Sequence, residues 1–146
     1  MNLSYDLAIN ISKKFHCLSL FIDFQKAFDT LDRKILMTKL YRLGIRGVAL
    51  NLIQSYFENR HHFTAVNDVT SMNCLSTVGT IQGSTLGPLF YIIYANDMNQ
   101  LFESDTYITN YADDTVITVH DKNIHDVYSK INTVIHRLMD WAKFNK

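Results

Sequence analysis

The sequence predicts an α+β domain, with helices packed mainly on one face of an antiparallel sheet. Short β-prone runs alternate with longer helical stretches, in the order β-α-α-β-β-α-β-β-α. Of the 146 residues, 47% are hydrophobic, so the chain can form a sizeable core. Five glycines, one proline and two cysteines exclude collagen-like chains, mucins and disulfide scaffolds. No apolar run is long enough to cross a membrane, and no signal peptide is visible, so we expect an intracellular domain.

The first third of the chain predicts one strand and two well-marked helices. Residues 17–24 (CLSLFIDF) are almost entirely apolar and are typical of a strand, whereas residues 3–14 show only a weak helical pattern. Asp32 is a plausible N-cap for a helix that stops at Gly44, because apolar residues recur between them at helical spacing. A second helix is predicted over residues 47–58.

The rest of the chain predicts two hairpins and two helices. Residues 60–67 and 73–81 are expected to form the first hairpin, around Asn67-Asp68, and residues 106–119 the second. The two helices are expected over residues 85–101 and 123–146. The helix from residue 85 follows a glycine-rich turn, and Pro88 is tolerated in a first helical turn. The last helix has a clear apolar stripe, so it should cover the sheet.

The cysteines and histidines do not form a metal-binding pattern. Cys17 and Cys74 have no second Cys or His at zinc-ligand spacing, so both are expected to be buried packing residues. His61-His62 could be metal ligands, but a pair in a polar loop is more often solvated. Basic residues predominate over residues 26–60 and acidic ones after residue 74, within a net charge of zero. This asymmetry fits phosphate contacts on one flank and cations on another, or ordinary solvated helices.

Three carboxylates and one glycine-rich turn are candidates for a catalytic site. Asp113-Asp114 lie at the tip of an apolar hairpin, where two adjacent charges are costly, although aspartates are also common in tight turns. Asp23 closes an apolar strand, which could simply meet water there. If the two strands are neighbours, the carboxylates form an all-oxygen site for divalent cations, preferably Mg²⁺. The turn with Gln82 and Ser84 offers polar groups to a phosphate or sugar, or is only a helix entry.

Three segments resemble motifs A, B and C of the reverse transcriptases of non-LTR (LINE-type) retrotransposons. They are FIDFQKAFDTLD (21–32), GTIQGSTLGPLFYIIYANDM (79–98) and YADDT (111–115), and Trp141 and Asn145 look like the helix leading into motif D. Ile81 stands where the family usually has proline, which leaves the turn less constrained. The resemblance implies that residues 1–146 are a partial reverse transcriptase domain, a polymerase palm core without fingers, thumb or endonuclease.

The resemblance also implies the chemistry. Asp23, Asp113 and Asp114 would hold two Mg²⁺ ions, with Mn²⁺ as a substitute, for attack of a primer 3′-OH on a dNTP. Phe24 would give its backbone carbonyl to a metal. Phe28 would act as a steric gate that selects dNTP over rNTP, although without the motif a core aromatic would be the better interpretation.

The remaining roles concern the nucleotide and the nucleic acid. Gln82, Gly83 and Ser84 match positions that contact the nucleotide and template, and Tyr111 and Lys26 would lie near primer and template. The implied partners are an RNA template, a DNA primer and dNTP in the full-length protein, in the nucleus or cytoplasm. The sequence does not set an oligomeric state.

Two alternatives remain open. The chain could be a decayed, non-catalytic retrotransposon fragment that at most binds nucleic acid, as Ile81 and the absent fingers and thumb suggest. A metal-dependent phosphohydrolase has less support, because it leaves Phe28 and Gln82 without a role. In either case a palm core should expose apolar surface where other domains pack.

Overall fold

The computed structural model describes residues 3–102, 106–111 and 113–145. The chain forms two compact units. The sheet unit contains the chain up to Gln25 and from Ala95 to Asn145, and the arm unit contains Lys26–Tyr94. Both mix helices with antiparallel strands, so the predicted α+β class is confirmed. None of the helices within the described ranges has the length and apolar character needed to cross a bilayer.

The sheet unit is built on three antiparallel strands with β7 in the centre. The strands are β1 (His16–Asp23), β6 (Thr106–Tyr111) and β7 (Asp114–Asp121), in the order β1-β7-β6. The register pairs His16 with Asp121 at one end of the sheet and Asp23 with Asp114 at the other. Both the strand and the hairpin predicted from the sequence are therefore confirmed.

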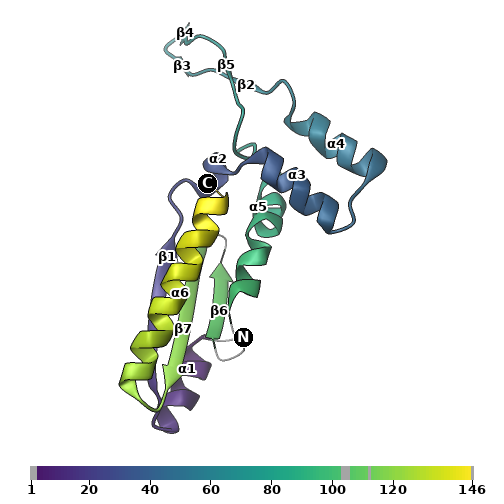
Figure 1. Cartoon of the computed structure of the whole chain (residues 1–146). Coiled ribbons are helices and arrows are strands. Elements are labelled where there is room, and N and C mark those ends of the chain that lie inside the picture. Colours follow the sequence, from purple (N-terminus) through teal and green to yellow (C-terminus); the bar gives the residue numbers. More distant parts are fainter. Residues whose placement is uncertain (1–2, 103–105, 112, 146) are drawn as a thin grey trace. The chain divides into compact units, whose positions relative to one another are not determined.

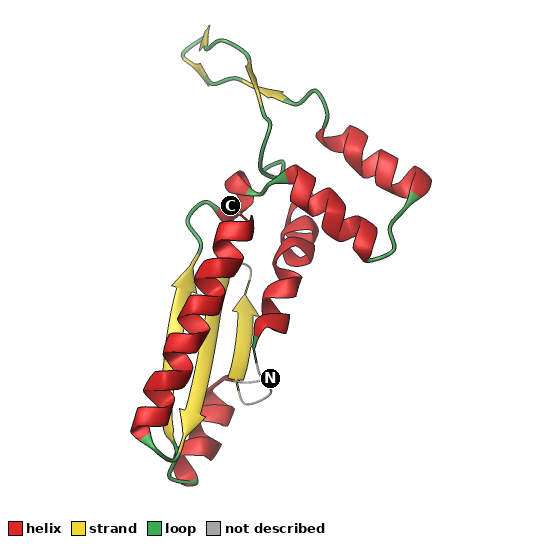
Figure 2. Ribbon diagram, viewed as in Figure 1, coloured by secondary structure: helices red, strands yellow, loops and turns green. Residues whose placement is uncertain are grey.

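One face of this sheet packs against α6 (Ile124–Asn145), which runs along the strands (Figures 1 and 2). Ile117 and Val119 of β7 are fully buried in the core, and Leu18 and Leu20 of β1 pack beside them. The helix contributes Val127, Ile131 and Val134. These three residues recur at spacings of four and three, which places them on one side of the helix. The predicted amphipathic helix is confirmed.

Two further helical segments belong to the sheet unit. The first helix, α1 (Leu3–Ser12), contacts β1. The predicted helix over 85–101 instead changes at Ala95 into a short 3₁₀ helix, η1 (Asn96–Leu101). Asn and Asp are poor residues for a helix interior, which explains the change at Asn96-Asp97. The η1 segment is tied to α6, because Arg137 Nη1 donates to the carbonyl of Leu101 over 2.9 Å.

The arm unit has a helical base. Its helices are α2 (Ala27–Thr30), α3 (Arg33–Arg42), α4 (Gly47–Phe57) and α5 (Gly87–Ala95), and the last residue of α5 lies in the sheet unit. Asp32 is the predicted N-cap of α3, since its Oδ1 accepts from the backbone N–H groups of Lys34 (2.8 Å) and Ile35 (3.2 Å). Leu36 and Leu40 of α3 form a core with Phe57 and Phe90.

Residues 58–79 form an exposed extension that we call the arm. It contains two short ladders (Figure 1): β2 (His61–His62) pairs with β5 (Cys74–Leu75), and β3 (Ala65–Val66) pairs with β4 (Val69–Thr70). The turn between β3 and β4 is Asn67-Asp68, with positive φ at both residues, so the predicted turn is confirmed.

The predicted strand over 73–81 is wrong beyond Leu75. The carbonyl groups of Ser76, Val78 and Gly79 do not pair with another strand, because they accept hydrogen bonds from the guanidinium of Arg33. Arg33 therefore replaces a strand partner and ties the end of the arm to the start of α3.

Candidate active-site carboxylates and the arm pocket

Asp23 and Asp114 are the last residue of β1 and the first residue of β7, and they are direct partners in the register. Direct partners in an antiparallel pair project to the same face of a sheet. Ile117 and Val119 lie an odd number of residues from Asp114 and face the α6 core, so the two carboxylates lie on the opposite face. Both residues are exposed. The two strands are thus neighbours in one sheet, which is the condition for a site shared by these carboxylates.

Asp113 and Tyr111 complete this end of the hairpin. Asp113 occupies the turn before β7 and is half-buried, while Ala112 lies outside the described residues. Tyr111 is the other register partner of Asp114 and is 82% exposed, so Asp114 lies between Asp23 and Tyr111 across the sheet. Among the described residues, no group of three or more His, Cys, Asp or Glu side chains is arranged to hold a metal ion. The backbone thus brings two carboxylates together without assembling a full ligand set.

The chemistry of these carboxylates nevertheless suits a hard divalent cation. Carboxylate oxygens are the ligands that Mg²⁺ prefers in proteins. Within the described part of the chain, the carboxylates of Asp23 and Asp114 form no hydrogen bond or ion pair. Two like charges that face each other across strands are destabilising unless something neutralises them. The donor set therefore fits a divalent cation.

Phe24 directs its side chain away from the carboxylates. Its ring centroid lies 5.9 Å from that of Trp141, on the α6 side of the sheet. The Trp141 Nε1–H donates to Asp97 Oδ1 over 2.8 Å, and Asn145 Nδ2 donates to the Trp141 carbonyl over 2.8 Å. The residues that suggested motif D therefore anchor the end of β1 to α6 and η1.

Two of the predicted site residues lie at the start of the arm unit. Phe28 is half-buried, with its ring centroid 4.8 Å from that of Tyr91 and the two ring planes inclined at 39°. The Phe28 carbonyl accepts a 2.7 Å hydrogen bond from the N–H of Thr80. Lys26 is exposed and adopts a positive φ of 56° immediately before α2. The Phe28 ring is thus held by α5, whereas Lys26 is open to solvent.

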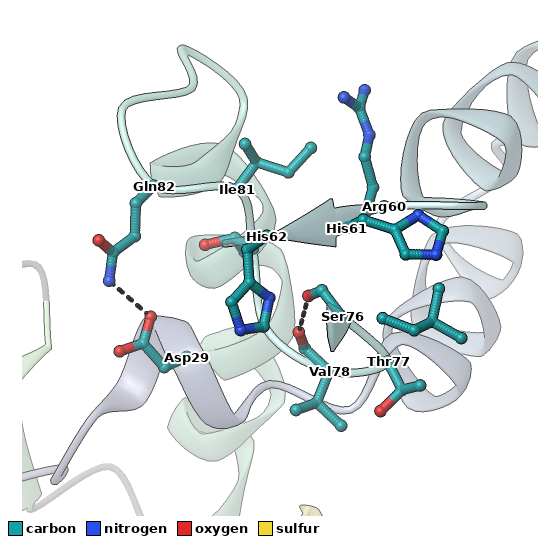
Figure 3. Close-up of a pocket in the computed structure, with 11 residues that line it drawn as sticks. Asp29, Arg60, His61, His62, Ser76, Thr77, Val78, Ile81 and Gln82 are labelled. Carbon is teal, nitrogen blue, oxygen red and sulfur yellow. Dashed lines mark hydrogen bonds between the residues drawn. The ribbon is translucent and has the colours of Figure 1, made fainter. Parts of the chain in front are cut away.

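The polar residues of the predicted nucleotide turn are already engaged. Gln82 Nε2 donates to Asp29 Oδ1 over 2.8 Å, as Figure 3 shows. Ser84 Oγ accepts from the N–H groups of Leu86 (3.1 Å) and Gly87 (3.2 Å) and is also bonded to the hydroxyl of Tyr56, so it caps the start of α5. Sequence reasoning missed Asp29, although it is the aspartate of the KAFD string.

A pocket of about 590 Å³ lies beside Gln82 and is walled mainly by the arm (Figure 3). Its lining comprises Asp29, Arg60, His61, His62, Leu75, Ser76, Thr77, Val78, Thr80, Ile81 and Gln82. Arg33 adds positive charge behind the Ser76 side, where its Nη2 donates to Ser76 Oγ over 2.8 Å. Burial, and then the charge of Arg60, lower the pKa of Arg33.

The cysteines differ in environment. The prediction that both are buried is wrong for Cys74, which is exposed on the arm as the register partner of His62. All residues of the two short arm ladders are exposed, so these strands have no buried face for Cys74, which explains the error. Cys17 is half-buried, and burial raises the pKa of its thiol. His61 and His62 are exposed, as predicted.

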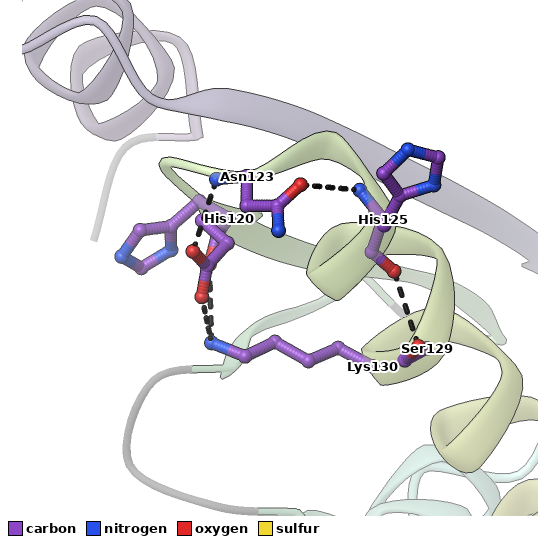
Figure 4. A network of polar contacts seen from close by, with 6 residues as sticks. His120, Asn123, His125, Ser129 and Lys130 are labelled. Carbon is purple, nitrogen blue, oxygen red and sulfur yellow. Dashed lines mark hydrogen bonds and ion pairs between the residues drawn. The ribbon is translucent and has the colours of Figure 1, made fainter.

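A polar cluster closes the connection from β7 to α6, at the end of β7 away from Asp114 (Figure 4). Lys130 Nζ lies 3.0 Å from Asp121 Oδ2 and donates to the carbonyl of His120 over 3.3 Å. The N–H of Asn123 donates to Asp121 Oδ1 over 3.2 Å. The hydrogen bond from Asn123, followed by that from Lys130, lowers the pKa of Asp121.

Comparison with known proteins identifies similar sequences over most of the chain. The profile of the reverse transcriptase (RNA-dependent DNA polymerase) family matches residues 5–145. The chain is 31% identical over 133 residues to a probable RNA-directed DNA polymerase from transposon X-element of Drosophila melanogaster, covering 89% of this chain and 14% of that protein. It is 30% identical over 139 residues to the RNA-directed DNA polymerase from mobile element jockey of the same species. This match covers 91% of this chain and 15% of that protein. The chain thus spans about one seventh of the curated relatives it matches.

Proposed function

Because the chain belongs to the reverse transcriptase (RNA-dependent DNA polymerase) family, we propose that it forms the palm of an RNA-directed DNA polymerase. The observation that supports this most is the register pairing of Asp23 with Asp114, beside the exposed ring of Tyr111. A backbone ladder fixes the spacing of the two strand ends more firmly than a loop would. In this proposal the carboxylates are held ready on a rigid element.

Asp23, Asp113 and Asp114 would hold the metal ions, with the backbone carbonyl of Phe24 as a further ligand. When bound, two divalent cations supply Lewis-acid stabilisation for in-line displacement at a phosphate. In this proposal the exposed Tyr111 ring positions the primer end. The RNA template, the DNA primer and dNTP would be partners of the longer protein.

The arm unit would contribute nucleotide selection. In this proposal Phe28 is the steric gate, and its contact with Tyr91 limits the movement of the ring. Gln82 would exchange its bond to Asp29 for a contact with nucleotide or template. Gly83, with a φ of 75°, allows the turn that brings the backbone near the ligand, and Lys26 would contact nucleic-acid phosphate.

The test is primer extension on an RNA template with Mg²⁺ and dNTP. In a full-length polymerase context, we expect extension by the parent sequence. We expect none by Asp23→Asn or by the Asp113→Asn/Asp114→Asn double variant. The matched control is Asp140→Asn, which removes an exposed carboxylate of α6 that pairs with Lys143. Equal extension by the double variant and the parent chain would refute the metal-ligand assignment.

A second candidate is a non-catalytic fragment that binds nucleic acid. It is favoured by the engagement of Gln82 and Ser84 within the chain, and by the lack of a three-residue ligand group among the described residues. Retained RNA binding without extension by any variant would support this candidate. Extension that depends on Asp23 would exclude it.

A further inference from the structure

The arm pocket is lined by several side chains that can donate hydrogen bonds. Arg60, His61 and His62 follow one another along its wall, and Ser76 and Thr77 lie directly after β5, where the arm returns. Asp29 is the only acidic residue among the described side chains that line the pocket, and its Oδ1 already accepts from Gln82. The guanidinium of Arg60 and the ring N–H groups of the two histidines are groups that bind phosphate oxygens.

Arg60 is fixed at its inner end and open at its outer end. Its Nε donates to the carbonyl of Tyr56 over 2.8 Å, and its guanidinium lies 5.2 Å from the centre of the Tyr56 ring. Within the described part of the chain its two terminal nitrogens form no hydrogen bond. A guanidinium held in this way loses little side-chain entropy when it binds an anion.

Arg33 adds positive charge behind the same wall, but its nitrogens are not available to a ligand. Its nitrogens are used by carbonyl groups of Ser76, Val78 and Gly79. After burial, the nearby charge of Arg60 is a further cause that lowers the pKa of Arg33, as expected for two positive charges that repel each other. An anion in the pocket would relieve that repulsion.

We propose that this pocket binds the phosphate backbone of a single nucleic-acid strand through Arg60 and His62. Phe63, the next residue along the arm, is 60% exposed and offers a ring on which a base can stack. An arginine and two histidines that lead along the arm into an exposed aromatic ring fit an extended strand better than a compact nucleotide. The inference rests on the proposed function only for its expectation that nucleic acid is the ligand.

The first test is fluorescence anisotropy with a labelled single-stranded RNA of about ten nucleotides. Arg60→Gln loses one charge-assisted contact, so we expect this variant to bind the RNA about fivefold to tenfold more weakly than the parent chain. The matched control is Arg46→Gln, since Arg46 lies 4.8 Å above the Tyr41 ring in a similar stack but does not line the pocket. We expect less than about a twofold change for this control. Equal weakening in both variants would show general charge attraction and overturn the proposal.

The second test uses Cys74 as a reporter in the unsubstituted chain. Because Cys74 is opposite His62 on the ladder, a bound strand should slow its alkylation, whereas Cys17 of β1 should react at an unchanged rate. Protection by dNTP at a matched concentration, without protection by RNA, would overturn the strand assignment. Arg60-dependent RNA binding without primer extension would leave this inference standing while the proposed function failed.

Discussion

Asp23 and Asp114 face each other as direct register partners where β1 ends and β7 begins, on the sheet face that points away from α6. Such a pair has two consequences. Two like charges at opposing positions destabilise the sheet, and the same two charges attract a divalent cation. The two facing carboxylates therefore lower the stability of the fold at the position where the proposed chemistry needs negative charge.

The first prediction follows from this pair. Asp114→Asn removes the repulsion, so without metal it should raise the free energy of unfolding by about 0.2–1 kcal/mol. Mg²⁺ should raise the melting temperature of the parent chain but not that of Asp114→Asn, because only the parent keeps both carboxylates. Thermal melting followed by circular dichroism, with and without MgCl₂, measures both effects. Asp140→Asn should respond to Mg²⁺ like the parent, and a response that survives in Asp114→Asn would contradict the assignment.

The second prediction concerns Arg33. It donates to the carbonyl groups of Ser76, Val78 and Gly79, a set that a lysine ammonium does not span. Arg33→Lys should lower the free energy of unfolding by about 2–3 kcal/mol, because carbonyl groups of the arm lose a charged donor. It should also speed proteolytic cleavage of the arm. Urea denaturation and limited proteolysis measure these effects.

Lys34→Ala is the control for this experiment, because Lys34 follows Arg33 in α3 and is exposed. Its unfolding midpoint and its rate of cleavage should match those of the parent chain. If the arm of Arg33→Lys resists proteolysis as well as the arm of the parent chain, the hydrogen bonds of Arg33 do not hold the arm in place.

Features encoded by short stretches of chain could be predicted from the sequence. The Asp32 cap, the Asn67-Asp68 turn and the amphipathic helix α6 each depend on residues close together in the chain. The sequence places Asp23 at the end of one apolar strand and Asp114 at the start of another, but that these strands are neighbours depends on the whole sheet and stays a condition until the register is seen.

Features set by distant contacts could not be predicted. The end of the arm has a strand-like pattern, but Arg33, more than forty residues earlier, takes its carbonyl groups. Cys74 looks like a packing residue, yet it and the other residues of its ladder are exposed. Gln82 was assigned from its motif, whereas its bond to Asp29 depends on how α2 meets the turn.

The third prediction tests the junction between the arm and α2. Gly79 has a φ of +76°, and a Cβ there would lie 2.5 Å from the backbone oxygen of Asp29, which cannot move aside as a side chain would. Gly79→Ala should therefore lower the free energy of unfolding by about 3 kcal/mol. Gly44 also has a positive φ but nothing within 4 Å of such a Cβ, so Gly44→Ala should cost only about 1–2 kcal/mol. Equal losses in urea denaturation would mean that the junction relaxes.

The fourth prediction concerns pH and the closure of β7 onto α6. Because hydrogen bonds from Asn123 and Lys130 lower the pKa of Asp121 in the folded chain, the folded state favours the charged carboxylate. The stability that this provides is present above the pKa of the unfolded chain and is lost as pH falls through the folded pKa, in the range below about pH 4. Asp121→Asn should therefore melt at a lower temperature than the parent near neutral pH, and the difference should disappear in acid. Melting temperatures of both chains across this range test the prediction, with Asp140→Asn expected to follow the parent throughout. A difference that persists unchanged in acid would show that Asp121 acts through its shape, and that its charge contributes nothing to the closure.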